Sequence, residues 1–253
     1  MKLLGTLNRK LERDPYLYRI ELLERLFQIL DNNEIVFVQP SCWTDPMENI
    51  IFNARILKDG AEYRHPAKDK IYAQCWSHDD DSYALWQIYT TKPDDRGVTK
   101  RHYGIRITTH LDKLNHLSAV NTGSFYYGQV NYLTQKALLK LPKDPNFVAC
   151  ISSEAINEEH INSLLIKRKS YLYENEVRLL YVPELSNKDT MPERIVRIKI
   201  EPHQLITSLR IDPAMPKKEA ALLKEQLTDQ YGFKPSQITQ STLNADNKLV
   251  FRI

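Results

Sequence analysis

Strand-like and helix-like segments follow one another along this chain without regular alternation, and this order constrains the fold more than any other feature. Residues 16–20 follow Pro15 and predict a strand, because Tyr and Ile favour a pleated, half-buried surface. Apolar residues from Leu22 to Leu30 then recur at helical spacing, and residues 34–38 predict the next strand. A doubly wound parallel sheet needs strict alternation of strand and helix, so the pattern favours an α+β fold.

The rest of the chain continues this irregular order. Residues 41–70 form a long connection rich in turn-forming Asp-Pro, Asp-Gly and His-Pro pairs. Further strands are expected at 71–76, 104–108 and 125–133, and helices near 47–57 and at 83–89 and 153–166. The C-terminal part, 205–253, predicts a strand, a helix and short final strands, at 205–211, 217–231, 238 and 249–253.

Length and composition indicate one soluble globular domain. Of 253 residues, 42% are hydrophobic and 26% are charged, which supplies a sizeable core, and no repeat or low-complexity run divides the chain. We therefore expect a single domain over 1–253, with a polar lead-in at 1–15 and a C-terminal extension at 205–253. A net charge of +3 permits contact with nucleic acid but does not require it.

The cysteines and the apolar runs bear on location. Cys42, Cys75 and Cys150 lie far apart without a CxxC pair, which argues against a zinc site or a disulfide framework and fits a reducing compartment. The N-terminal apolar stretch is too short for a signal peptide, and no run approaches the roughly 18 apolar residues of a membrane span. We expect a cytoplasmic protein that contacts no membrane.

The segment 171–181 is the first candidate for chemistry. In a strand, side chains alternate between two faces, so Glu174, Glu176 and Arg178 would share one face. The opposite face would carry the aromatic and aliphatic side chains of Tyr171, Tyr173, Val177 and Leu179. Two carboxylates beside a guanidinium predict either a half-covered site or a solvated face whose charges neutralise each other, and position alone leaves both open.

Two aromatic and basic groups form further candidates. Tyr18-Arg19 places an always-charged guanidinium on the first strand, where it would hold a phosphate or ribose or simply lie on the surface. Trp86 and Tyr89 lie three residues apart on one helical face. They would either stack on a nucleobase or nicotinamide or belong to the core.

Two charged runs have equally open interpretations. Asp79-Asp80-Asp81 would hold a divalent cation or form a solvated helix start, and it lacks the spacing of a calcium loop. Lys167-Arg168-Lys169 would guide a polyanion to the carboxylates or form a solvated turn. The sequence contains no Gly-rich phosphate loop, no GxSxG elbow and no HExxH pair.

Several motifs taken together resemble an uncharacterised bacterial domain-of-unknown-function family. The most specific are the Asp-Pro-x-Glu motif at 45–48 and the Tyr-Glu-x-Glu-x-Arg motif at 173–178. The resemblance runs in order from about residue 16 to about residue 245. It also includes the segments 18–19, 41–44, 75–77, 85–89, 104–109 and 167–172.

A looser resemblance is to the ADP-ribosyltransferase fold. That fold is implied by the order of an Arg on the first strand, a helix, a Ser region and a late strand bearing Glu, which Arg19, Ser77 and Glu176 match. Residues 175–177, Asn-Glu-Val, are similar to the start of the glutamate strand in poly-ADP-ribose polymerases, and Glu174-x-Glu176 is similar to the ExE of the toxin branch. The chain departs from the Ser-Thr-Ser pattern at residues 75–77, which read Cys-Trp-Ser.

The second resemblance implies split sheets with flanking helices, and NAD as a substrate. Glu176 would stabilise the oxocarbenium character that develops on the ribose, and Glu174 would orient or deprotonate the acceptor. The residues expected to bind NAD are Tyr18, Arg19, Ser77, Trp86 and Tyr89. Those expected to contact the acceptor or to fix the acids are Asp45, Glu48, Lys167, Arg168 and Arg178.

The leading hypothesis is therefore NAD-dependent ADP-ribosyl transfer to a protein or to RNA or DNA, in a toxin or anti-phage effector with a neutralising antitoxin as a further partner. One alternative is a non-enzymatic module that binds nucleic acid or a nucleotide through the charged strand face and Lys167–Lys169. Another is a metal-assisted nuclease that uses Glu174 and Glu176 with Asp45 or Glu48.

Overall fold

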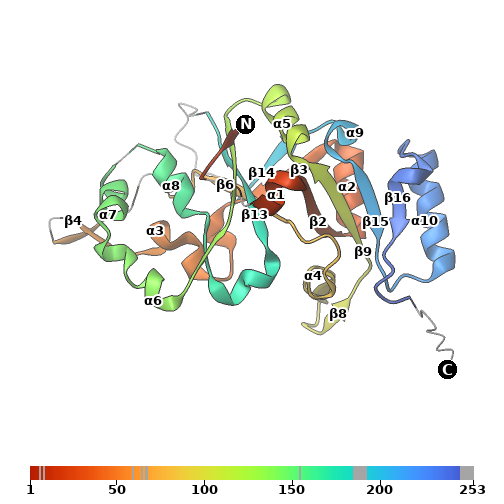
Figure 1. Cartoon of the computed structure of the whole chain (residues 1–253), viewed down its shortest axis with the longest axis horizontal. Coiled ribbons are helices and arrows are strands. Elements are labelled where there is room, and N and C mark those ends of the chain that lie inside the picture. The colour runs from red at the N-terminus through yellow and green to blue at the C-terminus, as the bar shows by residue number, and fades with distance from the viewer. Residues whose placement is uncertain are drawn as a thin grey trace.

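One large, mostly antiparallel sheet forms the framework of the protein (Figure 1). The computed structural model describes residues 1–5, 7, 9–58, 60–63, 65, 68–153, 155–184 and 193–245. Within these residues, ten strands run in the order β1-β10-β13-β6-β2-β9-β15-β16, with β3 pairing both β6 and β14. Their bounds are β1 (Lys2–Leu3), β2 (Tyr16–Leu22), β3 (Glu34–Val38), β6 (Tyr72–Ser77), β9 (Gly104–His110), β10 (Ser124–Gln129), β13 (Glu176–Val182), β14 (Ile195–Lys199), β15 (Ser208–Ile211) and β16 (Ile238–Gln240).

Smaller two-stranded sheets and short helices surround this framework. The strand pairs are β4 (Ile56–Lys58) with β5 (Ala61–Tyr63), β7 (Thr91–Pro93) with β8 (Thr99–Arg101), and β11 (Asn131–Leu133) with β12 (Ile166–Arg168). The α-helices are α1 (Arg9–Arg13), α2 (Leu23–Asn32), α3 (Ile50–Asn53), α4 (Tyr83–Tyr89), α5 (Asn115–Val120), α6 (Gln135–Leu138), α7 (Pro145–Ser152), α8 (Glu158–Ser163), α9 (Pro202–Leu205) and α10 (Lys217–Asp229). The 3₁₀ helices span Pro40–Cys42, Pro46–Asn49, Leu111–Leu114, Leu141–Lys143, Lys169–Glu174 and Pro235–Gln237.

The helices gather at the two ends of the molecule and over the sheet. Figure 1 shows α3, α6, α7 and α8 at one end and α10 with β16 at the other. Helix α2 buries Leu26, Ile29 and Leu30, and it ends where Asn33 adopts the left-handed conformation at φ 54°. Asn tolerates this conformation better than most residues, so the Asp-Asn-Asn sequence stops the helix directly before β3.

The central strands separate an apolar face from a charged one. Val177 and Leu179 of β13 pack in the main core together with Leu17 and Trp76. Glu176, Arg178 and Leu180 of the same strand alternate with them and face the other way. Leu180 packs in a second apolar cluster with α3 and α8, so the charged face is itself covered near its centre.

The sheet splits beside β6, and this split positions the candidate site. One edge of β6 pairs with β13 from Tyr72 to Ser77. On its other edge, Ser77 pairs with Tyr18 of β2, whereas Ala73 pairs with Val38 of β3. Strands β2 and β3 therefore diverge from β6 in different directions, which leaves an opening between them.

The expected α+β class is correct, and β3 has the predicted bounds. The C-terminal unit also forms as a strand, a helix and a parallel strand, although β15 starts at Ser208 and Leu205 belongs to α9. The predicted final strand at 249–253 lies outside the described residues. Among the helices of the described residues, none combines the length and the apolar character that crossing a membrane requires.

Four predictions need correction. Residues 171–181 are not one strand, because Asn175 adopts the left-handed conformation at φ 42° and separates the 3₁₀ helix Lys169–Glu174 from β13. The predicted strand 125–133 divides into β10 and β11, and only Glu158–Ser163 of the predicted helix 153–166 is helical. The lead-in 1–15 was expected to be polar, but it contributes β1 to the sheet and buries Leu4 and Leu11.

Candidate functional site

Three adjacent strands bring Tyr18, Ser77 and Glu176 into one row. Tyr18 of β2 pairs with Ser77 of β6, and Ser77 pairs in turn with Glu176 of β13. Residues directly opposite each other in a sheet place their side chains on the same face with Cβ atoms about 5 Å apart. The strand order therefore makes neighbours of three residues that lie far apart in the sequence.

Arg19 lies at the split in the sheet, next to this row. Its Nε donates to Oε1 of Glu21 at 2.5 Å, and its Nη1 donates to the carbonyl oxygen of Cys75 on β6. The guanidinium thus bridges the edges of β2 and β6 where the strands diverge. About a quarter of the Arg19 side chain remains exposed, so it is accessible from the opening.

Arg178 forms the centre of a buried ionic network behind the row. Its side chain is fully buried and donates to Glu48, to Oε1 of Glu176 at 2.7 Å and to the carbonyl oxygen of Leu164 at 2.5 Å. The ring of Trp43 lies 4.2 Å from the guanidinium carbon. A buried charge with this many partners fixes the carboxylates that it contacts.

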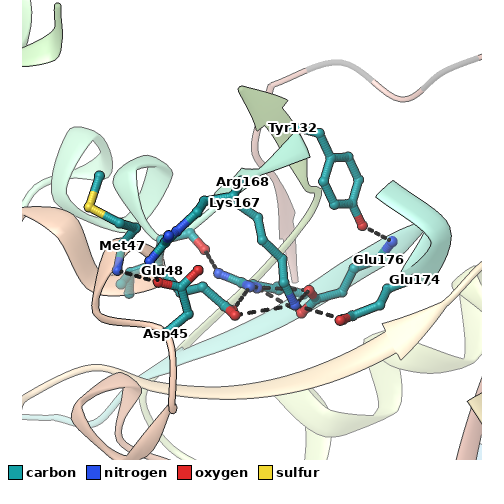
Figure 2. A network of polar contacts seen from close by, with 10 residues as sticks. Asp45, Met47, Glu48, Tyr132, Lys167, Arg168, Glu174 and Glu176 are labelled. Carbon is teal, nitrogen blue, oxygen red and sulfur yellow. Dashed lines mark hydrogen bonds and ion pairs between the residues drawn. The ribbon is translucent and has the colours of Figure 1, made fainter. Parts of the chain in front are cut away.

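Lys167 is the second cation of the network. Figure 2 shows its ammonium among three carboxylates, at 2.6 Å from Glu174, 3.1 Å from Glu176 and 3.3 Å from Glu48. Its side chain is 6% exposed and its ammonium lies 4.9 Å from the ring centre of Tyr171. The interpretation of Lys167 as an exposed guide for a polyanion is therefore wrong, because the side chain is buried and paired.

Asp45 and Arg168 extend the network toward the surface. Oδ1 of Asp45 accepts from Nη2 of Arg168 at 2.6 Å and from the backbone N–H of Met47 at 2.9 Å (Figure 2). Asp45 thereby begins the 3₁₀ helix that carries Glu48. The two most specific motifs, at 45–48 and 173–178, meet in this one network although more than a hundred residues separate them.

The two carboxylates nearest the row have opposite electrostatic environments. Burial alone would raise the pKa of Glu176, but Arg178 and Lys167 lower it to about 2, so this carboxylate is ionised at neutral pH. Burial raises the pKa of Glu174, against the opposing effect of Lys167. Burial also raises the pKa of the Cys75 thiol, which keeps this neighbour of Glu176 protonated.

Two connected cavities open at the row. The inner one is lined by Tyr18, Ser77, Glu174 and Glu176 and holds about 20 Å³, which is enough for a water molecule. The outer one measures about 390 Å³. Both are lined by Arg19, Cys75, Tyr89 and Glu174. The outer cavity has the size to hold part of a dinucleotide, whereas the inner one holds only a water-sized group.

The two aromatic residues of α4 have different environments. Tyr89 is 42% exposed and lines both cavities, as a stacking residue would. Trp86 is fully buried with Ile20 and Leu85, and its indole N–H donates to Asp81 at 2.8 Å. The expectation that Trp86 binds NAD is therefore corrected in favour of the core alternative.

The other two residues of the row, Ser77 and Tyr18, are held by neighbouring elements. The hydroxyl of Ser77 donates to the carbonyl oxygen of Glu174 at 2.7 Å, which ties the end of β6 to the 3₁₀ helix. Burial and the nearby Asp80 raise the pKa of Tyr18 to about 12. The guanidinium of Arg106 lies 4.6 Å from the centre of the Tyr18 ring.

Neither the acidic run at 79–81 nor the glutamates of the network have the environment of a metal site. Asp80 pairs with Arg106, and Asp81 accepts from Arg210 at 3.0 Å. Glu48, Glu174 and Glu176 already surround the ammonium of Lys167. Across the described part of the chain, no group of three or more His, Cys, Asp or Glu residues is arranged to hold a metal ion.

Two contacts of the network were not among the expected site residues. The hydroxyl of Tyr132 accepts from the backbone N–H of Glu176 at 2.8 Å, and Trp43 packs on Arg178. Trp43 lies two residues before the motif at 45–48, so its position close to a charged motif was an available signal. Tyr132 gave no such signal, because its place depends on the pairing of β11 with β12.

Scanning the chain against protein-family models gives no match, and a search among curated proteins gives none either. The family membership expected from the motifs therefore stays a prediction. Function has to be argued from the row, the network and the cavities.

Proposed function

We propose that this protein transfers ADP-ribose from NAD to a protein or nucleic-acid acceptor. The observation that carries the proposal is the row of Tyr18, Ser77 and Glu176 on three adjacent strands, with Arg19 beside it at the split in the sheet. Of these residues, Arg19, Ser77 and Glu176 are the ones on which the resemblance to the ADP-ribosyltransferase fold depends. Their order in the sequence alone did not require them to be neighbours.

The charge of Glu176 suits the proposed chemistry. Cleavage of the bond between nicotinamide and ribose develops positive charge on the sugar, which a fixed carboxylate stabilises more in the transition state than in the ground state. Glu176 stays ionised because its pKa is about 2, and Arg178, Lys167 and Tyr132 hold it in place. Such a fixed carboxylate keeps its charge and its orientation, and a sugar reaches it when the inner cavity of about 20 Å³ widens.

The neighbouring groups fit the remaining steps. Glu174 lines both cavities, and its raised pKa suits a group that accepts a proton from the acceptor. Arg19 would hold a phosphate or ribose oxygen, and Tyr89 would stack on a ring of the dinucleotide. Lys167 and Arg178 fix Glu174 and Glu176 through the network, and Asp45, Glu48 and Lys167 also line the outer cavity, where they would contact substrate. Arg168 fixes Asp45.

The proposal is tested by incubating the full chain with NAD labelled in its adenylate part and with cell extract. Release of nicotinamide and transfer of label to protein or nucleic acid are measured separately. We expect Glu176→Gln to lower both by roughly a hundredfold or more. Because this change also weakens the network, thermal unfolding of each variant is recorded, and Glu174→Gln serves as a second variant with a less buried side chain.

Asp212→Asn provides the matched control. Asp212 is a fully buried carboxylate that accepts from Arg101 at 2.8 Å, away from both cavities. Its loss should lower stability without lowering transfer by folded protein. Full activity of folded Glu176→Gln would overturn the proposal.

The resemblance extends the proposal to a toxin or anti-phage effector that a partner neutralises. In that case, induced expression of the wild-type chain slows bacterial growth, and Glu176→Gln relieves the effect at equal protein level. Equal growth inhibition by both chains would separate toxicity from the proposed transfer.

A further inference from the structure

A groove continues from the outer cavity across the split in the sheet. The outer cavity of about 390 Å³ and a neighbouring cavity of about 690 Å³ are both lined by Arg19, Val36, Val38 and Gln74. The second cavity extends between α2, β3 and β14. The two therefore form one continuous groove that begins at Glu174 and passes Arg19.

The floor of the groove is apolar. Strand β3 presents Val36 and Val38 on its outer face, and both are half-buried. Their cross-strand partners on β14 are Arg197 and Ile195. Val36, Val38 and Ile195 thus form an apolar strip that Arg197 borders.

Arginines supply the free charges of the groove. Arg25 and Arg197 are exposed, and within the described part of the chain neither forms a salt bridge. The Arg25 guanidinium donates to Oε1 of Gln28 at 3.1 Å. Glu21 is already paired with Arg19.

The outer cavity also carries Asp45, Glu48 and Glu174, which are paired with Arg168 and Lys167. In the cavity between α2, β3 and β14 the other carboxylate is Glu34, and its charge is opposed across the sheet. Its cross-strand partner is Lys199, and opposite charges in this position attract each other. With Glu21 and Glu34 offset in this way, the positive charge of Arg25 and Arg197 remains.

The end of the groove nearest Glu174 is aromatic. Trp43 and Tyr171 line the outer cavity there, next to Tyr89, which is assigned above to the dinucleotide. Sites for single-stranded nucleic acids combine aromatic rings for the bases with arginines for the phosphates. The groove offers both, in sequence along one apolar floor.

We propose that this groove binds a single-stranded nucleic acid, with bases on the aromatic end and the apolar floor and phosphates on Arg25 and Arg197. Binding of this strand is independent of the transfer proposed above. Its role as the acceptor rests on that transfer. A strand in the groove passes Glu174, which is the group proposed to accept the proton of the acceptor. RNA and DNA share the chemistry that the groove recognises.

Binding is measured by fluorescence anisotropy on the full chain, with labelled single strands of RNA and of DNA of about 12 nucleotides. We expect Arg25→Gln with Arg197→Gln to lower the affinity roughly tenfold and to reduce the slope of log K against log salt by about 1.4, since each phosphate contact on a single strand contributes about 0.7. Lys217→Gln with Lys218→Gln removes the same charge from exposed positions on α10 and should change neither quantity. If the double arginine variant lowers the affinity for one of the two strands more than for the other, that strand, RNA or DNA, is the one that the groove recognises.

Three outcomes would overturn the proposal: no binding of either strand, equal loss in the two double variants, and equally tight binding of heparin, which lacks bases. Failure of the two proposals is distinguishable, because absence of nicotinamide release with intact strand binding refutes only the transfer. Transfer of label to protein, with no strand binding, refutes only the nucleic-acid groove.

Discussion

Replacing Arg178 by Met tests whether the buried network holds Glu176 in its ionised form. The change keeps a long side chain but removes one of the two cations that contact both Glu176 and Glu48, and it leaves Lys167 in place. Removing one partner of a buried ion pair costs about 3–5 kcal/mol, because the remaining charge is left uncompensated. We expect a loss of this size in the free energy of unfolding at pH 7.

The pKa of Glu176 gives a second value for how much the network stabilises the folded state. It lies at about 2, compared with 4.5 for an unperturbed glutamate, so ionisation of this carboxylate stabilises the folded state by roughly 3 kcal/mol at neutral pH. Because the pKa is lower in the folded state, this contribution is complete above pH 4.5 and is lost as the pH falls from 4.5 toward 2. Without Arg178, burial favours the protonated form, so acid penalises the variant less than the wild type.

The assay is denaturant unfolding of both proteins at pH 7 and at pH 4, analysed by the linear dependence on denaturant. The difference in the free energy of unfolding should be largest at pH 7 and smaller at pH 4. Arg106→Met is the matched control, since Arg106 is almost as buried but pairs with Asp80, whose side chain is 57% exposed and can be solvated. A loss below about 1 kcal/mol in Arg178→Met, or a loss independent of pH, would refute this account of the network.

Three further predictions follow from single residues. If Glu174 accepts the proton of the acceptor, the transfer rate rises with pH through a pKa above 4.5, because the carboxylate must be ionised, and Glu174→Gln removes this dependence; a pH profile of label transfer checks both. Tyr89→Ala should weaken NAD binding measured by calorimetry, whereas Trp86→Phe should lower the melting temperature and leave NAD binding unchanged, since only Tyr89 is exposed. Asn175→Ala should cost about 1 kcal/mol in denaturant unfolding, because Ala is disfavoured at φ 42°, and Asn175→Gly should cost less.

The parts of the fold that the sequence predicted are those fixed by local patterns. Helix α2 and strands β2 and β3 follow from helical spacing, β-branched residues and the Asp-Asn-Asn stop, and all of these act within a few residues. The end of one strand and the start of the next were harder to place within long apolar runs. Residues 125–133 divide at Val130, whose backbone N–H donates to the carbonyl oxygen of Glu176. After it, β11 leaves the large sheet and pairs with β12. This pairing is a long-range contact, so no local sequence pattern predicts it.

The candidate site shows the same limit. Glu174, Glu176, Lys167 and Arg178 were all named from their charges, but their pairing was not predictable. Lys167 in a run of three cations looks solvated, and it is buried because β12 passes beside the 3₁₀ helix that carries Glu48. Whether a charge is free or paired depends on such neighbours, and sequence spacing does not report them.

The sequence prediction missed the break at Asn175, and of its errors this one matters most for the proposed function. On a continuous strand, Glu174 and Glu176 would lie on one face in similar surroundings. The left-handed turn at Asn175 instead leaves Glu176 in the sheet beside two cations and places Glu174 on the 3₁₀ helix. There, of the basic residues that the structure describes, Lys167 alone pairs with Glu174.

Two neighbouring carboxylates whose environments push their pKa values apart are suited to different roles in one reaction. Here the lowered pKa belongs to the group proposed to face the sugar cation, and the raised pKa to the group proposed to take a proton. A variant in which residues 171–181 form one continuous strand should therefore lose transfer even with both carboxylates present. In such a variant, Glu174 would no longer line the outer cavity.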